Sequence, residues 1–253
     1  MISVKKVNKR YGEFLVLEDL SITFPKGKVT SLIGGNGTGK STLLGVVSKL
    51  LSKDSGSVFV VDQDIADISS KEFATRLSFL KQSNHTHIRL KVRELVCFGR
   101  FPYNRGKRMC DEDCCMVDRA LNFMKLEDIE DKYIDELSGG QRQRAYLAMV
   151  LAQDTEYVLL DEPLNNLDMK HSVQIMRTLQ QLAKEFGKTV IIIVHDINIA
   201  AYYSDYIAAL KNGMIQYFGP TEEIIKPDIL KDIFGLDFEV IQRNGRPVCL
   251  YYN

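Results

Sequence analysis

Nine residues near the start of the chain have the types and spacing that bind phosphate groups. The segment GGNGTGKST fits the pattern G-x-x-x-x-G-K-[ST] between a predicted strand and a predicted helix. Lys40 can reach the outer phosphates of a nucleotide, Ser41 can bind Mg²⁺ and Thr42 can support the innermost phosphate. The Lys-Ser-Thr run argues against an ordinary glycine-rich turn. Backbone N–H groups complete the cradle, from Gly34, Gly35, Asn36, Gly37, Thr38 and Gly39.

A second segment, LSGGQ, also has the features of an anion site. Ser138 can cap the helix that follows, and Gln141 stands three residues later, as a capping box requires. Gly139 and Gly140 lack Cβ atoms, so their backbone can approach a ligand closely. The N–H groups and positive dipole end of a helix N-terminus favour an anion. The chain therefore has two predicted phosphate sites.

Polar residues follow three apolar segments of the chain. Asp161 and Glu162 come directly after a predicted strand, where Asp161 can hold Mg²⁺ through water and Glu162 can act as general base. His195 follows the segment TVIIIV, and we expect it to contact the outermost phosphate rather than to be structural. Gln82 follows LSFLK and could reach Mg²⁺ or the attacking water, although a loop Gln alone indicates little.

Strands and helices must alternate to position these residues. Short apolar strands are predicted within residues 27–34, 156–163 and 188–196, with helices after the first and between the other two. This alternation is typical of a parallel sheet covered by helices, whose ligands bind at the carboxyl ends of the strands. Two Asn-Gly hairpins are predicted in residues 207–218 and 238–252. The helix of residues 169–187 has an apolar stripe of Val173, Met176, Leu179, Leu182, Ala183 and Phe186.

Composition excludes some classes of protein. The chain has 33 Lys and Arg against 33 Asp and Glu, which gives no support for bulk binding to nucleic acid or anionic lipid. No apolar run approaches the ~18 residues of a membrane span, and the start lacks the apolar stretch of a signal peptide. We therefore expect a cytoplasmic protein. Five cysteines, an odd number, are expected to be free thiols, with Cys97 and Cys249 buried.

Taken together, these motifs resemble those of the ATP-binding subunits of ABC transporters, over essentially the whole chain. The resemblance assigns Tyr11 to adenine stacking, the first glycine-rich segment to Walker A, Gln82 to the Q-loop and His195 to the H-loop. Residues 157–161 match Walker B, Glu162 the catalytic glutamate, and Asp168 the end of the D-loop. The family signature is matched by Leu137, Ser138, Gly139, Gly140 and Gln141.

The resemblance implies a fold, ligands and partners. The expected fold class is α/β, a P-loop NTPase (RecA-like) core with an antiparallel β subdomain and an inserted α-helical subdomain. We expect one ABC domain over 1–253, with the core at 1–84 and 155–220, the helical subdomain at 85–154 and a C-terminal extension at 221–253. ATP and Mg²⁺ are the implied cofactors, with Ser41, Gln82 and Asp161 at the metal. A second copy would complete an ATP-sandwich dimer in which each signature serves the partner's ATP.

The resemblance extends to one branch of importers. VCFGRFPYNRG and EPLNNLDMKHSVQIM resemble the ATPases for iron–siderophore, haem and cobalamin import, and residues 80–103 look most like those for petrobactin-type catecholates. A membrane permease and, indirectly, a substrate-binding protein are the implied partners, without nucleic acid, at the cytoplasmic face of the membrane. The alternatives are a P-loop kinase, which needs no LSGGQ, an iron–sulfur assembly ATPase, and a chromosome-maintenance ATPase, which needs long coiled coils.

The chain departs from the family pattern in two of these motifs. Gly35 and Thr38 stand where Pro and Ala are frequent, and Asn165 and Asn166 where small residues are frequent, yet we expect activity to survive. An apolar cluster beside the Q-loop is expected to line a groove for a permease helix, although packing inside the helical subdomain is the alternative. Its members are Phe98, Phe101, Pro102 and Tyr103, flanked by Arg100 and Arg105.

Overall fold

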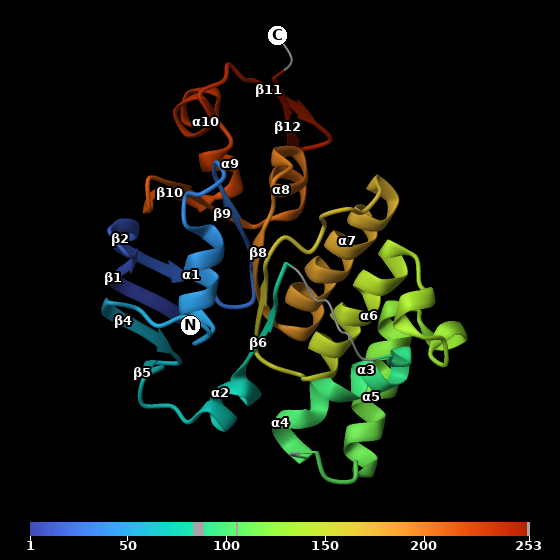
Figure 1. Cartoon of the computed structure of the whole chain (residues 1–253). Helices are drawn as coiled ribbons and strands as arrows, with labels where there is room; N and C mark the ends of the chain where they lie inside the picture. Colours follow the sequence, from blue (N-terminus) through green and yellow to red (C-terminus); the bar gives the residue numbers. More distant parts are fainter. Residues whose placement is uncertain (83–88, 105, 252–253) are drawn as a thin grey trace. The chain divides into compact units, whose positions relative to one another are not determined.

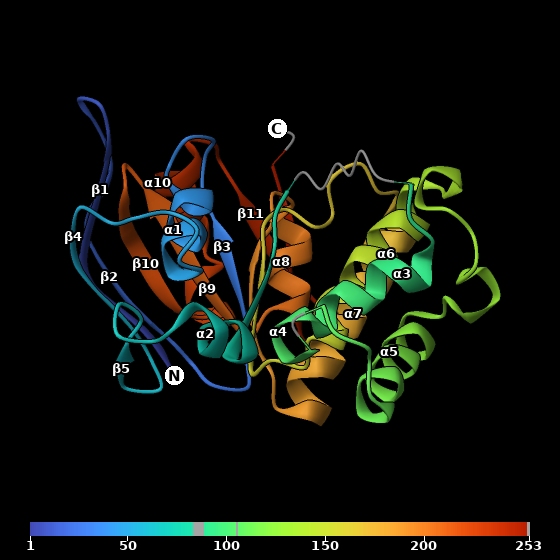
Figure 2. The same cartoon turned by 60° about the horizontal axis from the view of Figure 1, so that its bottom comes forward.

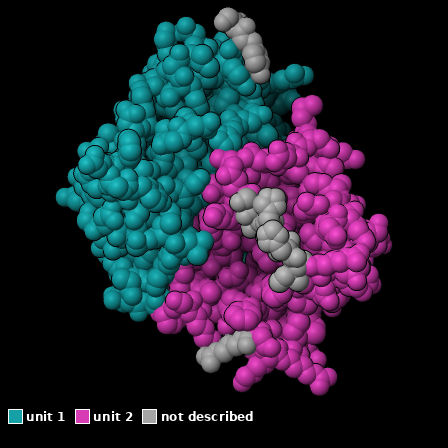
Figure 3. Space-filling model, viewed as in Figure 1, with its two compact units in different colours: residues 1–68, 176–253 teal, residues 69–175 magenta. Residues whose placement is uncertain are grey.

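The computed structural model describes residues 1–82, 89–104 and 106–251 of the chain. They form two compact units, shown in separate colours in Figure 3. Unit 1 comprises residues 1–68 and 176–253, and unit 2 comprises residues 69–175. The expected boundaries of the helical subdomain at residues 85 and 154 stay a prediction.

Unit 1 contains three groups of paired strands (Figure 1). An antiparallel sheet has the order β2-β1-β4-β5, with β1 Ile2–Tyr11, β2 Phe14–Phe24, β4 Ser55–Val60 and β5 Gln63–Asp64. A second group has the order β10-β9-β3-β8, with β3 Val29–Ile33, β8 Thr189–Ile193, β9 Tyr206–Lys211 and β10 Met214–Pro220. A separate hairpin joins β11 Glu239–Arg243 to β12 Arg246–Leu250. The helices are α1 Lys40–Val47, α8 Ile197–Tyr203, α9 Thr221–Ile224 and α10 Pro227–Phe234.

Continuous apolar runs explain the parallel strands at the centre of unit 1. β3 pairs in parallel with both β8 and β9, and every residue of β3 and β8 is buried. Strands that are buried on both faces read as unbroken apolar segments rather than alternating ones. The two polar residues of β3 are also buried, and Ser31 shares a hydrogen bond with Ser204 at 2.6 Å. The buried position of β3 therefore fixes the point at which the glycine-rich segment begins.

Both predicted Asn-Gly hairpins are confirmed. β9 and β10 are joined by Asn212 and Gly213, and β11 and β12 by Asn244 and Gly245. All four residues have positive φ, between 50° and 78°. A two-residue turn of this kind matches the twist of the strands on either side, and Asn and Gly adopt it at the smallest cost.

Unit 2 is mostly helical (Figure 2). In its described residues, strands β6 Leu77–Leu80 and β7 Tyr157–Leu160 pair in parallel. Its α-helices are α2 Ser70–Arg76, α3 Val92–Cys97, α4 Phe101–Asn104, α5 Asp111–Met124 and α6 Gly139–Ala152. Short 3-10 turns span Phe98–Arg100, Glu127–Ile129 and Ile134–Glu136. α7, Met169–Phe186, begins in unit 2 and ends in unit 1.

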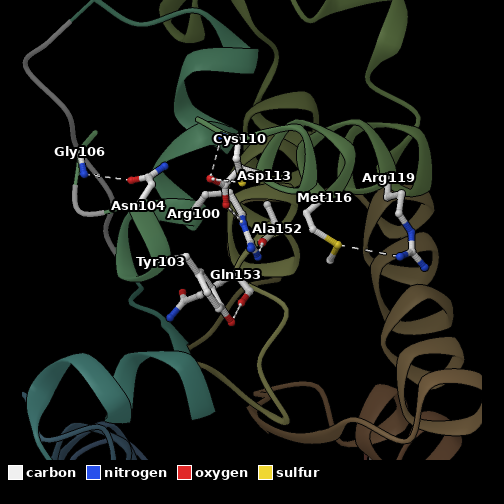
Figure 4. Close-up of polar contacts among 10 residues, drawn as sticks. All are labelled: Arg100, Tyr103, Asn104, Gly106, Cys110, Asp113, Met116, Arg119, Ala152 and Gln153. Atoms are coloured by element: carbon white, nitrogen blue, oxygen red, sulfur yellow. Dashed lines mark hydrogen bonds and ion pairs between the residues drawn. The ribbon is translucent and has the colours of Figure 1, made fainter. Parts of the chain in front are cut away.

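The helices of unit 2 pack around α6. Every residue of α6 after Gly139 is buried or half-buried, as its apolar composition predicts. A buried ion pair lies beside its C-terminus, where Nε of Arg100 donates to Oδ1 of Asp113 at 2.9 Å and Nη1 donates to the Ala152 carbonyl at 2.9 Å (Figure 4). Because an unpaired buried charge is costly, these contacts fix the start of α5 against the end of α6.

Several sequence expectations are refined by the structure. Along α7 the expected stripe is buried at Met176, Leu179, Leu182 and Ala183, but Phe186 is 48% exposed because it lies at the end of the helix.

All five cysteines are free thiols, and Cys249 is buried while Cys97 is only half-buried. Among the described residues, no helix combines the length and the apolar character needed to cross a membrane.

Candidate functional site

The first glycine-rich segment forms a loop between β3 and α1, and two of its glycines cannot be replaced without moving backbone. Gly34 has φ +138°, and a Cβ there would overlap the carbonyl oxygen of Leu210. Gly39 has φ +98°, and its Cβ would lie 2.8 Å from the Val16 carbonyl oxygen. Gly35 is different, because its Cβ would meet only Thr38 at 3.8 Å. The fold therefore tolerates a larger residue at position 35.

Lys40 places a buried positive charge within this loop. It is 5% exposed, and its Nζ donates to the carbonyls of Gly34 at 2.8 Å and Gly35 at 2.7 Å. The N-cap of α1 is Gly39, which has no side chain to cap the first turn. A helix N-terminus of this kind beside an ammonium group attracts an anion. The donor set thus fits the phosphates of a nucleotide.

Tyr11 and His195 are the other expected site residues of unit 1. Tyr11 ends β1 and is 47% exposed, with Nζ of Lys9 5.4 Å from the centre of its ring. His195 is exposed and lies one residue beyond Val194, which follows β8. Asp196 then caps α8 by accepting the N–H groups of Asn198 and Ile199. His195 is therefore held between a buried strand and a capped helix.

Three residues of unit 2 meet at one carboxylate oxygen. Oε2 of Glu162 accepts hydrogen bonds from Nε2 of Gln82 and Nδ2 of Asn165, each at 2.5 Å. Glu162 has φ +51°, a left-handed conformation that a non-glycine residue adopts only when its surroundings hold it. Asp161 beside it is 4% exposed, and its N–H donates to the Leu80 carbonyl at 2.9 Å. The two carboxylates therefore have different surroundings. Asp161 is buried beside β6, and Glu162 accepts hydrogen bonds from two side-chain amides.

The LSGGQ segment begins α6 with the expected capping box. The N–H of Gln141 donates to Oγ of Ser138 at 3.3 Å, and the N–H of Ser138 donates to Oε1 of Gln141 at 3.1 Å. Leu137 and Gly140 are buried, whereas Ser138 and Gly139 are exposed. The capping box has the form that the sequence predicts, and the role of this first turn as an anion site stays a prediction.

Two residues that take part in these contacts were not candidates in the sequence. Asn165 departs from the family pattern in the sequence, and in the structure its side-chain amide donates to Glu162. His171 carries no signal in the sequence, and its ring Nδ1 lies 2.8 Å from Oδ1 of Asp168. The structure thus joins Gln82 to Glu162, and Asp168 to His171, within unit 2. Tyr11, the Lys40 loop and His195 belong to unit 1.

Comparison with known proteins gives the family. The model of the ABC transporter family matches residues 17–165. The chain is 53% identical over 253 residues to the petrobactin import ATP-binding protein YclP of Bacillus subtilis (strain 168), with 100% of both chains covered. It is 49% identical over 251 residues to the petrobactin import ATP-binding protein FatE of Bacillus anthracis, covering 99% of this chain and 100% of that one.

Solved structures agree with the architecture. A metal-chelate type ABC transporter in an inward-facing conformation is similar in fold, with a TM-score of 0.85 at 24% identity, covering 99% of this chain and 96% of that one. A dimeric bacterial ABC transporter cassette has a TM-score of 0.78 at 31% identity, covering 87% of this chain and 99% of that one. The expected fold class, a P-loop NTPase of the ABC type, is confirmed. On its motifs, its fold and its relatives, this chain belongs to the ABC transporter family and is an ATP-binding subunit of that family.

Proposed function

We propose that this chain hydrolyses ATP to power import of an iron–siderophore complex through a membrane permease. The observation that carries the proposal is the full-length identity of 53% to a protein that is named for petrobactin import. A second relative, at 49%, is named for import of the same siderophore. A petrobactin-type catecholate is therefore the substrate class we favour.

The nucleotide site of unit 1 supports this proposal. Tyr11 offers an exposed ring on which adenine can stack. Lys40 would exchange its hydrogen bonds to two loop carbonyls for contacts with the outer phosphates, because its ammonium group already lies within the loop. Backbone N–H groups of the loop would hold the inner phosphates. The residues proposed for this role are Gly34, Gly35, Asn36, Gly37, Thr38, Gly39, Lys40, Ser41 and Thr42.

Three side chains with oxygen donors are proposed to hold Mg²⁺. The hydroxyl of Ser41 and the amide oxygen of Gln82 are neutral oxygen ligands, and the buried Asp161 carboxylate would hold the ion through water. When bound, Mg²⁺ would neutralise charge on the outer phosphates. The residues themselves supply a hard-oxygen set, which is the set that this ion requires.

Glu162 is the proposed general base. Its carboxylate accepts two amide hydrogen bonds, so its orientation is fixed before water arrives. A positioned base of this type contributes about 10²–10⁴-fold to the rate. His195, held at the end of β8, is proposed to donate a hydrogen bond to the outermost phosphate oxygen. Gln82 donates one of the two hydrogen bonds and is proposed to orient the base.

A second copy of the chain is proposed to complete each site. The exposed N-terminus of α6 would approach the outermost phosphate of ATP bound to the partner, where its dipole stabilises developing negative charge. Asp168 would lie at the same interface. The signature residues in this role are Leu137, Ser138, Gly139, Gly140 and Gln141.

An exposed aromatic surface is the proposed permease contact at the cytoplasmic face of the membrane. Phe98 is 51% exposed and Phe101 is 58% exposed, which favours docking over internal packing for these two residues. Arg100, expected to flank this surface, is instead buried with Asp113, and Arg105 lies outside the described residues. Tyr103 donates its hydroxyl to the Gln153 carbonyl at 2.9 Å, so it also has a structural role.

Growth under iron limitation tests the proposal. A strain that lacks this protein should fail to grow on a petrobactin-type catecholate as the sole iron source, and the wild-type gene should restore growth. The Glu162→Gln gene is the matched control that should not restore it. Equal growth of the deleted strain would contradict the siderophore assignment. If the deleted strain grows on the catecholate but fails to grow with haem as the iron source, the result would instead favour a haem importer.

A further inference from the structure

The two glycines of the signature have different steric surroundings. A Cβ at Gly140 would lie 2.7 Å from Cγ and Cδ2 of His171 and 3.0 Å from its Nδ1. A Cβ at Gly139 would meet only the Asn166 carbonyl oxygen, at an ordinary contact distance of 3.8 Å. Gly140 is therefore required by the packing of an imidazole ring, and Gly139 is not.

The ring of His171 is fixed by Asp168. The backbone N–H of His171 donates to Oδ1 of Asp168 at 2.8 Å, and ring Nδ1 lies 2.8 Å from the same oxygen. A carboxylate only accepts hydrogen bonds, so Nδ1 carries the proton in this contact. These bonds, the backbone one first, hold the pKa of the Asp168 carboxyl below its ordinary value. The ionised carboxylate thus orients the ring toward Gly140.

The contact joins the first turns of two helices. Gly140 is the second residue of α6, and His171 is the third residue of α7. The first turns of both helices belong to unit 2. Asp168 caps α7 while it holds the ring, so a shift of the D-loop would move the ring against α6.

We propose that His171 is a positioning residue that fixes the signature end of α6 against the D-loop. The role rests on the proposed function, in which this end of α6 binds ATP held by a second copy. A helix dipole stabilises charge only over the first turn, so a small rotation of α6 would weaken that contact. In this role His171 acts through Gly140 and Asp168, the residues that it contacts.

Thermal unfolding of the isolated subunit tests the contact without any dimer. Gly140→Ala should lower Tm by at least about 2 °C, because the added methyl group meets the ring. Gly139→Ala, the matched control, should leave Tm within about 1 °C of the wild type. Gly140→Ala should lower Tm much less in a His171→Ala chain than in the wild-type chain, because the ring that the added methyl group meets has been removed. Additive losses in the double variant would overturn the proposed contact.

ATP-dependent dimerisation tests the positioning role. In a Glu162→Gln background, His171→Ala should weaken dimerisation by about fivefold, the loss expected when the dipole of α6 is no longer aimed at the partner's phosphate. Affinity for ATP in the monomer should be unchanged, because the P-loop is intact. His171→Asn, which can still donate to Asp168, should restore most of the dimer. A merely structural role would lower Tm and leave dimerisation per folded subunit unchanged.

The two proposals fail in different ways. If Glu162→Gln alone does not dimerise with ATP, the composite site of the proposed function is wrong. If Glu162→Gln dimerises and the added His171→Ala has no effect on dimerisation, His171 has no positioning role and the composite site stands. Steady-state kinetics in the otherwise wild-type chain gives an independent readout, since His171→Ala should lower kcat and leave KM within about twofold.

Discussion

Gln82 and Glu162, 80 residues apart in the chain, share a hydrogen bond of 2.5 Å between Nε2 and Oε2. The same oxygen accepts a second bond from Asn165. Gln82 lies just before the segment 83–88, which is outside the described residues. A change in the Q-loop or the D-loop would therefore be transmitted directly to the carboxylate that we propose as general base.

Removing that base separates ATP binding from hydrolysis. Glu162→Gln keeps the shape of the side chain but cannot take a proton from water. The variant should bind ATP and hydrolyse it at least about a hundred times more slowly. It should also accumulate as an ATP-bound dimer, measured by size-exclusion chromatography with ATP, first without and then with Mg²⁺.

A substitution in the LSGGQ signature provides the control for ATP-dependent dimerisation. Ser138→Arg removes the cap of α6 and adds bulk and charge at an exposed position, without touching the P-loop. Combined with Glu162→Gln, it should abolish the dimer and leave ATP binding by the monomer intact. A dimer that forms as well as in Glu162→Gln alone would contradict a composite site.

Lys40→Ala should weaken ATP binding itself. The ammonium is buried and already within the loop, so its charge acts on the bound ground state. A lost charge-assisted contact is worth about 1.5–3 kcal/mol, which corresponds to at least about a tenfold rise in Kd. Titration calorimetry with ATP measures it. Thr38→Ala is the control, since its hydroxyl donates to the Gly35 carbonyl at 3.0 Å and carries no charge.

The buried ion pair of Arg100 and Asp113 should dominate the stability of the helical region. Arg100→Met leaves a buried carboxylate without its partner, which costs about 3–5 kcal/mol of unfolding free energy. Arg76→Met breaks a partly exposed pair with Glu72 in the same unit and should cost about 1 kcal/mol or less. Urea unfolding compares the two variants, and equal losses would contradict the role of burial.

The same pair predicts a pH dependence. Burial by itself raises the pKa of the Asp113 carboxyl, but hydrogen bonds from Arg100 and Cys110 outweigh burial and lower the pKa overall. A lowered folded-state pKa gives stability that is present above the ordinary value of 3.8 and is lost as the pH falls below it. Asp113→Asn should therefore flatten the acid limb of the stability curve, measured by Tm between about pH 2 and 7.

The aromatic surface should serve transport rather than folding. Phe98→Ala/Phe101→Ala removes two exposed rings, so ATP binding and Tm should stay close to wild type while transport falls. Phe186→Ala removes a ring that is 48% exposed at the end of α7, and it should leave transport unchanged. Uptake of iron–siderophore in cells measures the effect. Normal uptake by the double variant would remove the proposed docking surface.

Thiol reactivity should follow burial. Burial, with a smaller effect of the Asp196 charge, raises the pKa of Cys249 from 9.0 to about 11. Its thiolate fraction near neutral pH is therefore about a hundredfold lower than for an ordinary thiol. Mass spectrometry after brief iodoacetamide treatment at pH 8 should find Cys110, Cys114 and Cys115, which are exposed, modified first. Fast labelling of Cys249 in the native protein would contradict its burial.

Local features of the site follow from the sequence alone. The phosphate loop, the capping box of Ser138 and Gln141 and both Asn-Gly turns are each defined by residues only a few positions apart. Their conformations depend on backbone φ and on short hydrogen bonds, and residue type determines both. The alternation of apolar strands and helices likewise indicated an α/β fold, because burial on both faces requires unbroken apolar segments.

Tertiary structure decided the contacts between distant segments. Arg100 looked like a surface charge and is buried, Phe186 belonged to an apolar stripe and is exposed, and Gly140 looked like a ligand glycine and is packed on His171. No periodicity encodes these facts, since each depends on which helices pack together and at what distance. Residue types and their short-range spacing define the chemical groups of the site and the turns that present them. Only packing determined which side chain each group meets, because a contact between distant residues is set by the whole core rather than by its neighbours in the chain.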